Sequence, residues 1–145
     1  MKVRHILATK VGGVITITPQ DSVKTAVSRL AEHNIGVLLV VAEDGKLIGI
    51  ISERDIVRQA AADNNVLTLS VAEVMTHDVK VGLPQDDLMA VANTMTDGRF
   101  RHLPIVDNDE LIGIISIGDV IKIQRDVFRG EIDTLETQLL QEDES

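Results

Sequence analysis

The chain has 145 residues, a formal net charge of −9 and no cysteine. The missing cysteines exclude a disulfide scaffold, thiolate catalysis and Cys-ligated zinc, and an acidic chain without a lysine-arginine stripe is not expected to bind nucleic acid directly. No apolar run approaches the ~20 residues of a membrane span, and the first residues have no signal-peptide pattern, so we expect a cytoplasmic protein without membrane contact.

Strand and helix patterns alternate along the first half of the chain. A β-branched run leads to Thr18, and either Thr18 or Asp21 caps a helix whose apolar residues recur at helical spacing until Asn34. Two further β-branched runs flank a polar hairpin turn at residues 43–46, and another helix follows Ser52. The predicted elements are a strand at 14–17, a helix at about 21–33, strands at 37–41 and 47–51, and a helix at about 52–62.

The second half repeats this order and then departs from it. The predicted elements are a strand at 79–81, a helix at 86–96, strands at 102–106 and 111–115 around a turn at 107–110, and a long helix after Asp119. On that last helix Phe128, Ile132, Leu135 and Leu139 form a heptad-like seam on an otherwise charged surface. The seam either folds back on the core or meets the same helix of a second chain.

An internal repeat of about 65 residues explains the parallel between the halves. Gly-Ile-Ile-Ser followed by Asp occurs once with Ser52 and Asp55 and again with Ser116 and Asp119, each time after Leu-Ile. We therefore expect two similar subdomains packed as a pair. The predicted division is a first subdomain at 1–70, a second at 71–127 and a helical extension at 128–145.

The duplicated pattern resembles a pair of cystathionine-β-synthase (CBS) domains, often called a Bateman module, of the stand-alone prokaryotic kind. The resemblance covers residues from about 3 to about 125 and rests on four motifs: Ser52-Glu53-Arg54-Asp55, Val74-Met75-Thr76, Arg101-His102-Leu103-Pro104 and Ser116-Ile117-Gly118-Asp119. It implies an α/β (α+β) fold of two pseudo-symmetric β-α-β-β-α units, a cleft between them, homodimerisation and the binding of an adenosine-containing ligand.

The Ser-x-x-Asp spacing has two compatible interpretations. It is the spacing of a helix capping box, in which serine and aspartate satisfy each other's backbone N–H groups. A helix N-terminus also suits a phosphate, and a carboxylate there can accept hydrogen bonds from a ribose diol. By resemblance, Asp55 and Asp119 bind ribose, and Ser52 and Ser116 lie near ribose or phosphate.

Arg99, Arg101 and His102 crowd the start of a strand in an acidic protein. They form either a solvated basic loop or a phosphate clamp, since a guanidinium binds phosphate in bidentate fashion. The corresponding residues of the first copy are uncharged. We therefore predict two unequal half-sites. The tighter one contains Arg99, Arg101, His102, Ser116 and Asp119. The other half-site spans residues 52–55, has only Arg54, Arg58 and Lys10 as cations, and is expected to be weaker, different or empty.

By the same resemblance, Thr16, Met75, Thr76 and Val79 contact the adenine, although a plain strand or core role is equally consistent with them. Pro104 completes the predicted site. With two Phe and no Trp or Tyr in the chain, the adenine is expected in an apolar slot without an aromatic stack.

Neither an enzyme nor a metal protein is expected. The chain has no nucleophile-and-base pair, no phosphate-binding glycine motif and no His-x-x-x-His spacing. The favoured prediction is a non-catalytic module for signal transduction and energy sensing. It would bind AMP first, with ADP, ATP, NAD or S-adenosylmethionine as alternatives, and act on an unidentified partner protein. The alternative is a constitutive dimeric scaffold without a ligand.

Overall fold

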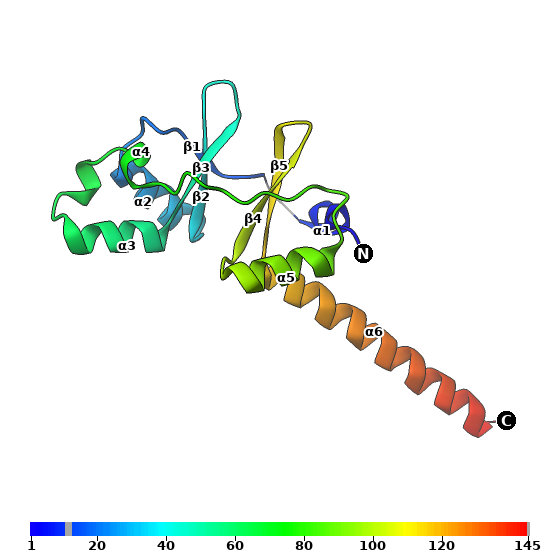
Figure 1. The fold of residues 1–145 in the computed structure, drawn as a ribbon. Helices are drawn as coiled ribbons and strands as arrows, with labels where there is room; N and C mark the ends of the chain where they lie inside the picture. Colours follow the sequence, from blue (N-terminus) through cyan, green and yellow to red (C-terminus); the bar gives the residue numbers. More distant parts are fainter. Residues whose placement is uncertain (11–12, 145) are drawn as a thin grey trace.

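The computed structural model describes residues 1–10 and 13–144, which form two lobes and one projecting helix (Figure 1). The first lobe holds a three-stranded sheet in the order β1-β2-β3, in which β1 is parallel to β2 and β2 antiparallel to β3. Its elements are β1 (Thr16–Ile17), α2 (Val23–His33), β2 (Val37–Val41), β3 (Leu47–Ser52), α3 (Glu53–Ala62), the 3-10 helix η1 (Val66–Thr68) and α4 (Val71–Val74).

The second lobe is built around an antiparallel pair of strands. Its elements are α1 (Val3–Thr9), α5 (Leu88–Gly98), β4 (His102–Asp107), β5 (Glu110–Ser116) and the first turns of α6 (Ile117–Glu144). The mixed helix and strand content and the long C-terminal helix confirm the predicted fold class.

The strand predicted at 79–81 is wrong. In the first lobe the N–H of Leu39 donates to the carbonyl of Ile15 (3.4 Å) and helps to attach β1 to the sheet. The corresponding residue of the second lobe is Pro104, which has no N–H to donate. Only Gly82 pairs there, as an isolated bridge to Ile105. The proline thus explains why this sheet has lost its third strand.

The two lobes exchange a helix. The helix α1 is the first element of the first repeat but packs into the core of the second lobe through Val3 and Ile6. The helix α4 is the first element of the second repeat and packs into the first core through Val71. The backbone bonds match, since Val71 N–H donates to the Asp21 carbonyl (2.8 Å) and Val3 N–H to the Asp86 carbonyl (3.0 Å). The division at residue 70 stays a prediction of the repeat, and the packing crosses it in both directions.

The glycine of each Gly-Ile-Ile-Ser motif lets the exchanged segment approach. A Cβ on Gly49 would lie 2.7 Å from the sulfur of Met75 and 3.0 Å from the carbonyl oxygen of Thr76. A Cβ on Gly113 would lie 2.7 Å from a methyl carbon of Leu7. These separations are below van der Waals contact. Because Gly49 meets a backbone atom, β3 needs glycine where the exchanged segment crosses it, whereas Gly113 meets only the end of a side chain.

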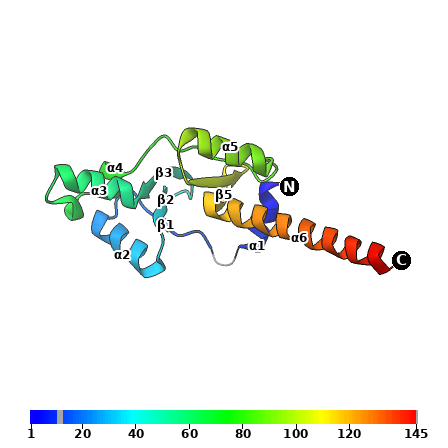
Figure 2. The same ribbon diagram turned by 90° about the horizontal axis from the view of Figure 1, so that it is seen from below.

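The helix α6 leaves the second lobe after its first turns and projects away from both lobes (Figures 1 and 2). Val120 is buried in the second core and Ile123 packs against it. The seam residues Phe128 and Leu135 are 62% and 59% exposed, so the seam does not fold back on the core. Although α6 is long, no helix of residues 1–10 and 13–144 is both long and apolar enough to cross a membrane.

Candidate functional site

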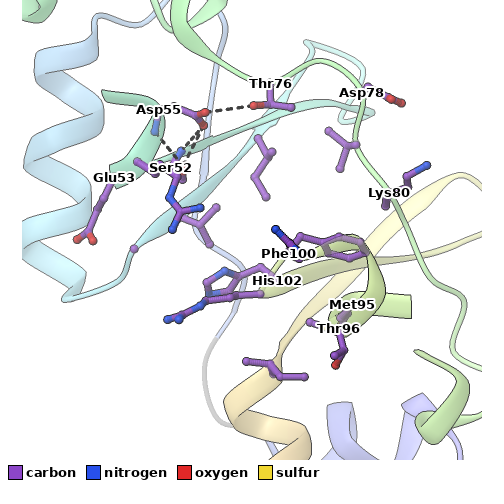
Figure 3. A pocket seen from close by; sticks show the side chains of 18 residues that line it. Ser52, Glu53, Asp55, Thr76, Asp78, Lys80, Met95, Thr96, Phe100 and His102 are labelled. Carbon is purple, nitrogen blue, oxygen red and sulfur yellow. Dashed lines mark hydrogen bonds between the residues drawn. The ribbon is translucent and has the colours of Figure 1, made fainter. Parts of the chain in front are cut away.

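A cleft of about 1060 Å³ opens where the two lobes face each other (Figure 3). Both lobes and the segment that joins them contribute to its wall. The lining residues are Gly36, Val37, Ile50, Ser52, Glu53, Arg54, Asp55, Thr76, Asp78, Val79, Lys80, Met95, Thr96, Arg99, Phe100, Arg101, His102 and Ile117. Its size is that of a site for a small molecule such as a nucleotide.

The wall on the first lobe is the capping box at the start of α3. The N–H of Ser52 donates to Asp55 Oδ2 (2.9 Å), and the N–H of Asp55 donates to Ser52 Oγ (3.1 Å). The second oxygen of Asp55 accepts a hydrogen bond from the Thr76 hydroxyl (3.2 Å). The Ser52 hydroxyl also donates to Asp55 Oδ2 (3.0 Å). A carboxylate has about four lone-pair positions, so Asp55 keeps about one acceptor position toward the cleft. Figure 3 shows these three side chains together at one end of it.

The wall on the second lobe carries two of the four cationic residues that line the cleft. They are Arg99 at the end of α5 and Arg101, which lies beside the neutral His102 at the start of β4. Arg99 ends its helix with a φ of 57°, a left-handed conformation that the corresponding Asn34 also adopts. An L-residue other than Gly, Asn or Asp pays a steric penalty of roughly 1–2 kcal/mol there. Lys80, from the segment joining the lobes, adds a further cation.

The second capping box has different surroundings. Ser116 and Asp119 repeat the geometry of the first pair, with Ser116 N–H donating to Asp119 Oδ2 at 2.8 Å and Asp119 N–H to Ser116 Oγ at 3.1 Å. Neither residue lines the cleft. Instead Lys10 Nζ lies 2.9 Å from Asp119 Oδ2 and also donates to the carbonyl of Ile114 (2.7 Å). A lysine therefore faces this carboxylate where a threonine hydroxyl faces Asp55.

The pKa of His102, a cleft residue, depends on charges at the second capping box as well as on its neighbour Arg101. Partial burial lowers the pKa of the His102 imidazole, the Lys10 cation lowers it further, the Asp119 carboxylate opposes the change and Arg101 adds to it. For Asp119, partial burial acts to raise the pKa. The hydrogen bond and charge of Lys10 and the bonds from Ser116 outweigh that effect and leave the pKa below its ordinary value. His102 is thus neutral at pH 7 in the free protein, and Asp119 is ionised.

The CBS domain family pattern matches residues 3–62 and 71–126 of the sequence, one match for each repeat. The chain belongs to the CBS domain family. It is a tandem CBS pair, as the resemblance of its motifs predicts, and the cleft lies between the two CBS domains.

Two solved structures and one relative compared by sequence illustrate the similarity of this chain to other CBS proteins. The crystal structure of the CBS-domain containing protein ATU1752 from Agrobacterium tumefaciens has a TM-score of 0.81 at 38% identity, over 86% of this chain and 99% of that one. The CBS domain-containing protein YhcV of Bacillus subtilis is 35% identical over 107 residues, which span 74% of this chain and 76% of the relative. The CBS domain pair of protein MJ0100, solved in complex with 5′-methylthioadenosine and S-adenosyl-L-methionine, has a TM-score of 0.74 at 30% identity, over 90% of this chain and 98% of that one.

The CBS pair brings most of the predicted site residues together, but in a different grouping. The cleft contains Ser52, Arg54, Asp55, Thr76, Val79, Arg99, Arg101 and His102. The basic cluster was predicted beside Asp119. It lines the cleft that also contains Asp55, and its His102 is at the same time paired with Ser116 across β4 and β5. Lys10 was assigned to the first half-site and contacts Asp119. The reason is the pairing of the lobes, in which the clamp of one domain faces the capping box of the other.

The remaining predicted residues lie outside this cleft. Ser116 and Asp119 belong to the second position, while Pro104 is buried in β4. Met75 packs against the first core, and Thr16 pairs with Leu39 in the sheet. The alternative that Met75 and Thr16 have core and strand roles therefore has direct structural support.

Phe100 and Lys80 are cleft residues that the sequence analysis missed. Phe100 places an aromatic ring on the wall, whereas the sparse aromatic content predicted only aliphatic neighbours for the adenine. Its position between Arg99 and Arg101 was the available signal. Among residues 1–10 and 13–144, no group of three His, Asp or Glu side chains is placed to hold a metal ion.

Proposed function

We propose that this CBS pair is a non-catalytic regulatory module that binds an adenosine nucleotide in the cleft between its two domains. The observation that carries the proposal is the composition of that cleft. A carboxylate with spare acceptor capacity, Asp55, lies on one wall, and the guanidinium groups of Arg99 and Arg101 lie on the other. Asp55 would accept hydrogen bonds from the ribose hydroxyls and the arginines would bind phosphate.

The charge of the cleft supports a phosphorylated ligand over an uncharged one. The cationic lining residues are Arg54, Lys80, Arg99 and Arg101, and the acidic ones are Glu53, Asp55 and Asp78. The arginines cluster at one end of β4 in a protein whose formal net charge is −9, so a local positive site stands out against the overall charge. AMP is the simplest ligand that fits, with ADP, ATP and NAD as longer versions.

The relative MJ0100 supports adenosine as the recognised part. Its CBS pair was solved with S-adenosyl-L-methionine and 5′-methylthioadenosine, which share adenosine and lack phosphate. Here Phe100 and Val79 offer a flat apolar surface for the base. The two arginines are the feature that would direct this protein toward phosphate. Signalling to a partner protein and a cytoplasmic location remain part of the proposal.

Calorimetric titration with AMP, ADP, ATP, NAD and S-adenosylmethionine tests the proposal. A ligand present at ~100 times its dissociation constant adds ~2.7 kcal/mol to stability, so thermal unfolding gives an independent reading. Arg101→Ala should weaken phosphate-bearing ligands about tenfold or more, because a charge-assisted hydrogen bond is lost. The matched control is Arg58→Ala on α3, which does not line the cleft.

A flat response to all five ligands would reject the module and favour the scaffold. Protein purified without added ligand should also be analysed by mass spectrometry for retained nucleotide. Chromatography of each nucleotide after incubation with the protein tests the absence of catalysis, and recovery of unchanged ligand is the expected result.

A further inference from the structure

The exposed stripe of α6 is a surface that nucleotide binding does not use. We call Phe128, Ile132, Leu135 and Leu139 the α6 seam. They follow one another at intervals of four, three and four residues, and their side chains are 62%, 39%, 59% and 60% exposed. This interval is that of a coiled coil, in which Phe128 and Leu135 take d positions and Ile132 and Leu139 take a positions. The segment lies well beyond both lobes in Figure 1.

The charges on α6 are divided between its two ends. Lys122, Arg125 and Arg129 precede Gly130, along with Asp119 and Asp126. Every charge after Gly130 is acidic, as in Glu131, Asp133 and Glu136. Arg129 and Glu136 are both e positions, directly beside the seam. A seam with a basic e position in its first half and an acidic e position in its second half is complementary to a copy of itself that runs in the opposite direction.

We propose that two copies of this chain associate through their α6 helices, antiparallel and seam against seam. In the best register Ile132 of one copy lies beside Leu135 of the second, and Leu139 beside Phe128, so every seam residue meets another seam residue. The same register brings Arg129 of each copy to Glu136 of the other. A twofold axis perpendicular to the helices then relates the copies and makes the interface self-complementary.

Parallel pairing of the same seam is unfavourable. It would place Arg125, which occupies the next a position, against Arg125 of the second copy inside the apolar layer. It would also bring Glu131, a g position, near Glu136 of the second copy. Both contacts bring like charges together, and the two Arg125 side chains would also lose their hydration inside the apolar layer. Charge therefore selects the antiparallel orientation.

The body of the protein leaves room for this pairing. The register overlaps about residues 125 to 142 of each copy, roughly 27 Å of helix. Gln124, just before this segment, still contacts Met89 of α5 through a hydrogen bond of 2.7 Å to the sulfur. The overlap thus begins where α6 leaves its own lobe. With only four apolar layers the pair is expected to be weak and to depend on protein concentration.

A first experiment tests the seam by sedimentation equilibrium of the intact protein over a concentration series. Leu135→Lys should weaken association at least tenfold. The matched control is Leu140→Lys, since Leu140 is 65% exposed on the same helix but lies off the seam. It should leave association within about twofold of the original. A protein that stays monomeric at every concentration, or one whose association ignores Leu135→Lys, would overturn the proposal.

A second experiment tests the orientation with charge reversals. Arg129→Glu and Glu136→Arg should each weaken self-association about tenfold, because two symmetric pairs become repulsive. A mixture of these two variants, and the double variant alone, should associate like the original protein. Association that strengthens in Glu136→Arg alone would indicate parallel helices and overturn the proposal. Circular dichroism of each variant checks that α6 stays helical, and none of these changes touches the nucleotide cleft.

Discussion

The two capping boxes of this CBS pair have the same geometry and different neighbours. Asp55 accepts a hydrogen bond from the Thr76 hydroxyl and faces a cleft rich in arginine, whereas Asp119 forms an ion pair with Lys10. The backbone of the repeat is preserved at both places. At the two capping boxes the copies differ in the side chains that meet each carboxylate. The duplicated backbone is therefore the same, while the chemical surroundings of the two carboxylates differ.

The strongest test of this comparison asks whether the halves are independent in stability. Ile51 and Ile115 occupy matching strand positions and both are fully buried, one in each core. Replacing either by Ala should lower the free energy of unfolding by about 2–5 kcal/mol. Because α1 and α4 are exchanged between the lobes, both variants should unfold in a single transition by calorimetry. Two separate transitions would show that the exchange does not couple the lobes.

The next test compares the carboxylates themselves. Asp55→Asn should weaken AMP binding about 10- to 100-fold, because a charged acceptor for the ribose hydroxyls is lost. Asp119→Asn should change the affinity less than about threefold, since Asp119 does not line the cleft. Calorimetric titration measures both. Unliganded thermal unfolding controls for the damaged caps, which are alike in the two variants, and equal losses of affinity would contradict the grouping of the site.

Features that depend on neighbouring residues were predicted correctly from the sequence, whereas features that result from the pairing of the lobes were not. The helix α3 begins after Ser52 and β2 spans the residues expected, because caps, turns and β-branched runs act within a few residues. The grouping of Arg101 could not be predicted in this way. The repeat assigns Arg101 to the same copy as Asp119, whereas the cleft also brings it to the same site as Asp55 of the opposite lobe.

Two smaller differences between the predictions and the structure also have specific causes. The strand expected at 79–81 is missing because Pro104, on the neighbouring strand, removes a donor that its counterpart Leu39 supplies. Lys10 reaches Asp119 because the helix α1 packs in the second lobe, although it is the first element of the first repeat. Both facts concern contacts between segments far apart in the chain, which local patterns do not contain.

Gly49 and Gly113 occupy matching positions in the two repeats but differ in the atoms that an added Cβ would meet. Gly49→Ala would place a Cβ 3.0 Å from a backbone carbonyl, which cannot move without shifting the chain, and should cost about 1–2 kcal/mol. Gly113→Ala would meet only the end of the Leu7 side chain, which can rotate, and should cost less. Chemical denaturation of both variants measures the difference. A larger loss for Gly113→Ala would show that the α1 contact is the more rigid one.

Removing the ion pair between Lys10 and Asp119 should have the smallest effect on the free energy of unfolding. The side chains of Lys10 and Asp119 are 34% and 29% exposed, so Lys10→Met should cost only about 0.2–1 kcal/mol near pH 7. The pKa of Asp119 is lowered in the folded state, so the associated stability is present above the unfolded pKa of about 4 and is lost as the pH falls through the folded pKa. The difference in the free energy of unfolding between Lys10→Met and the original protein should therefore shrink in acid.

Lys24→Met on α2 controls for the lost charge, and NMR titration should show the pKa of Asp119 rising in Lys10→Met alone. An unchanged Asp119 pKa would mean that the hydrogen bonds from Ser116, rather than Lys10, lower the pKa of this carboxylate.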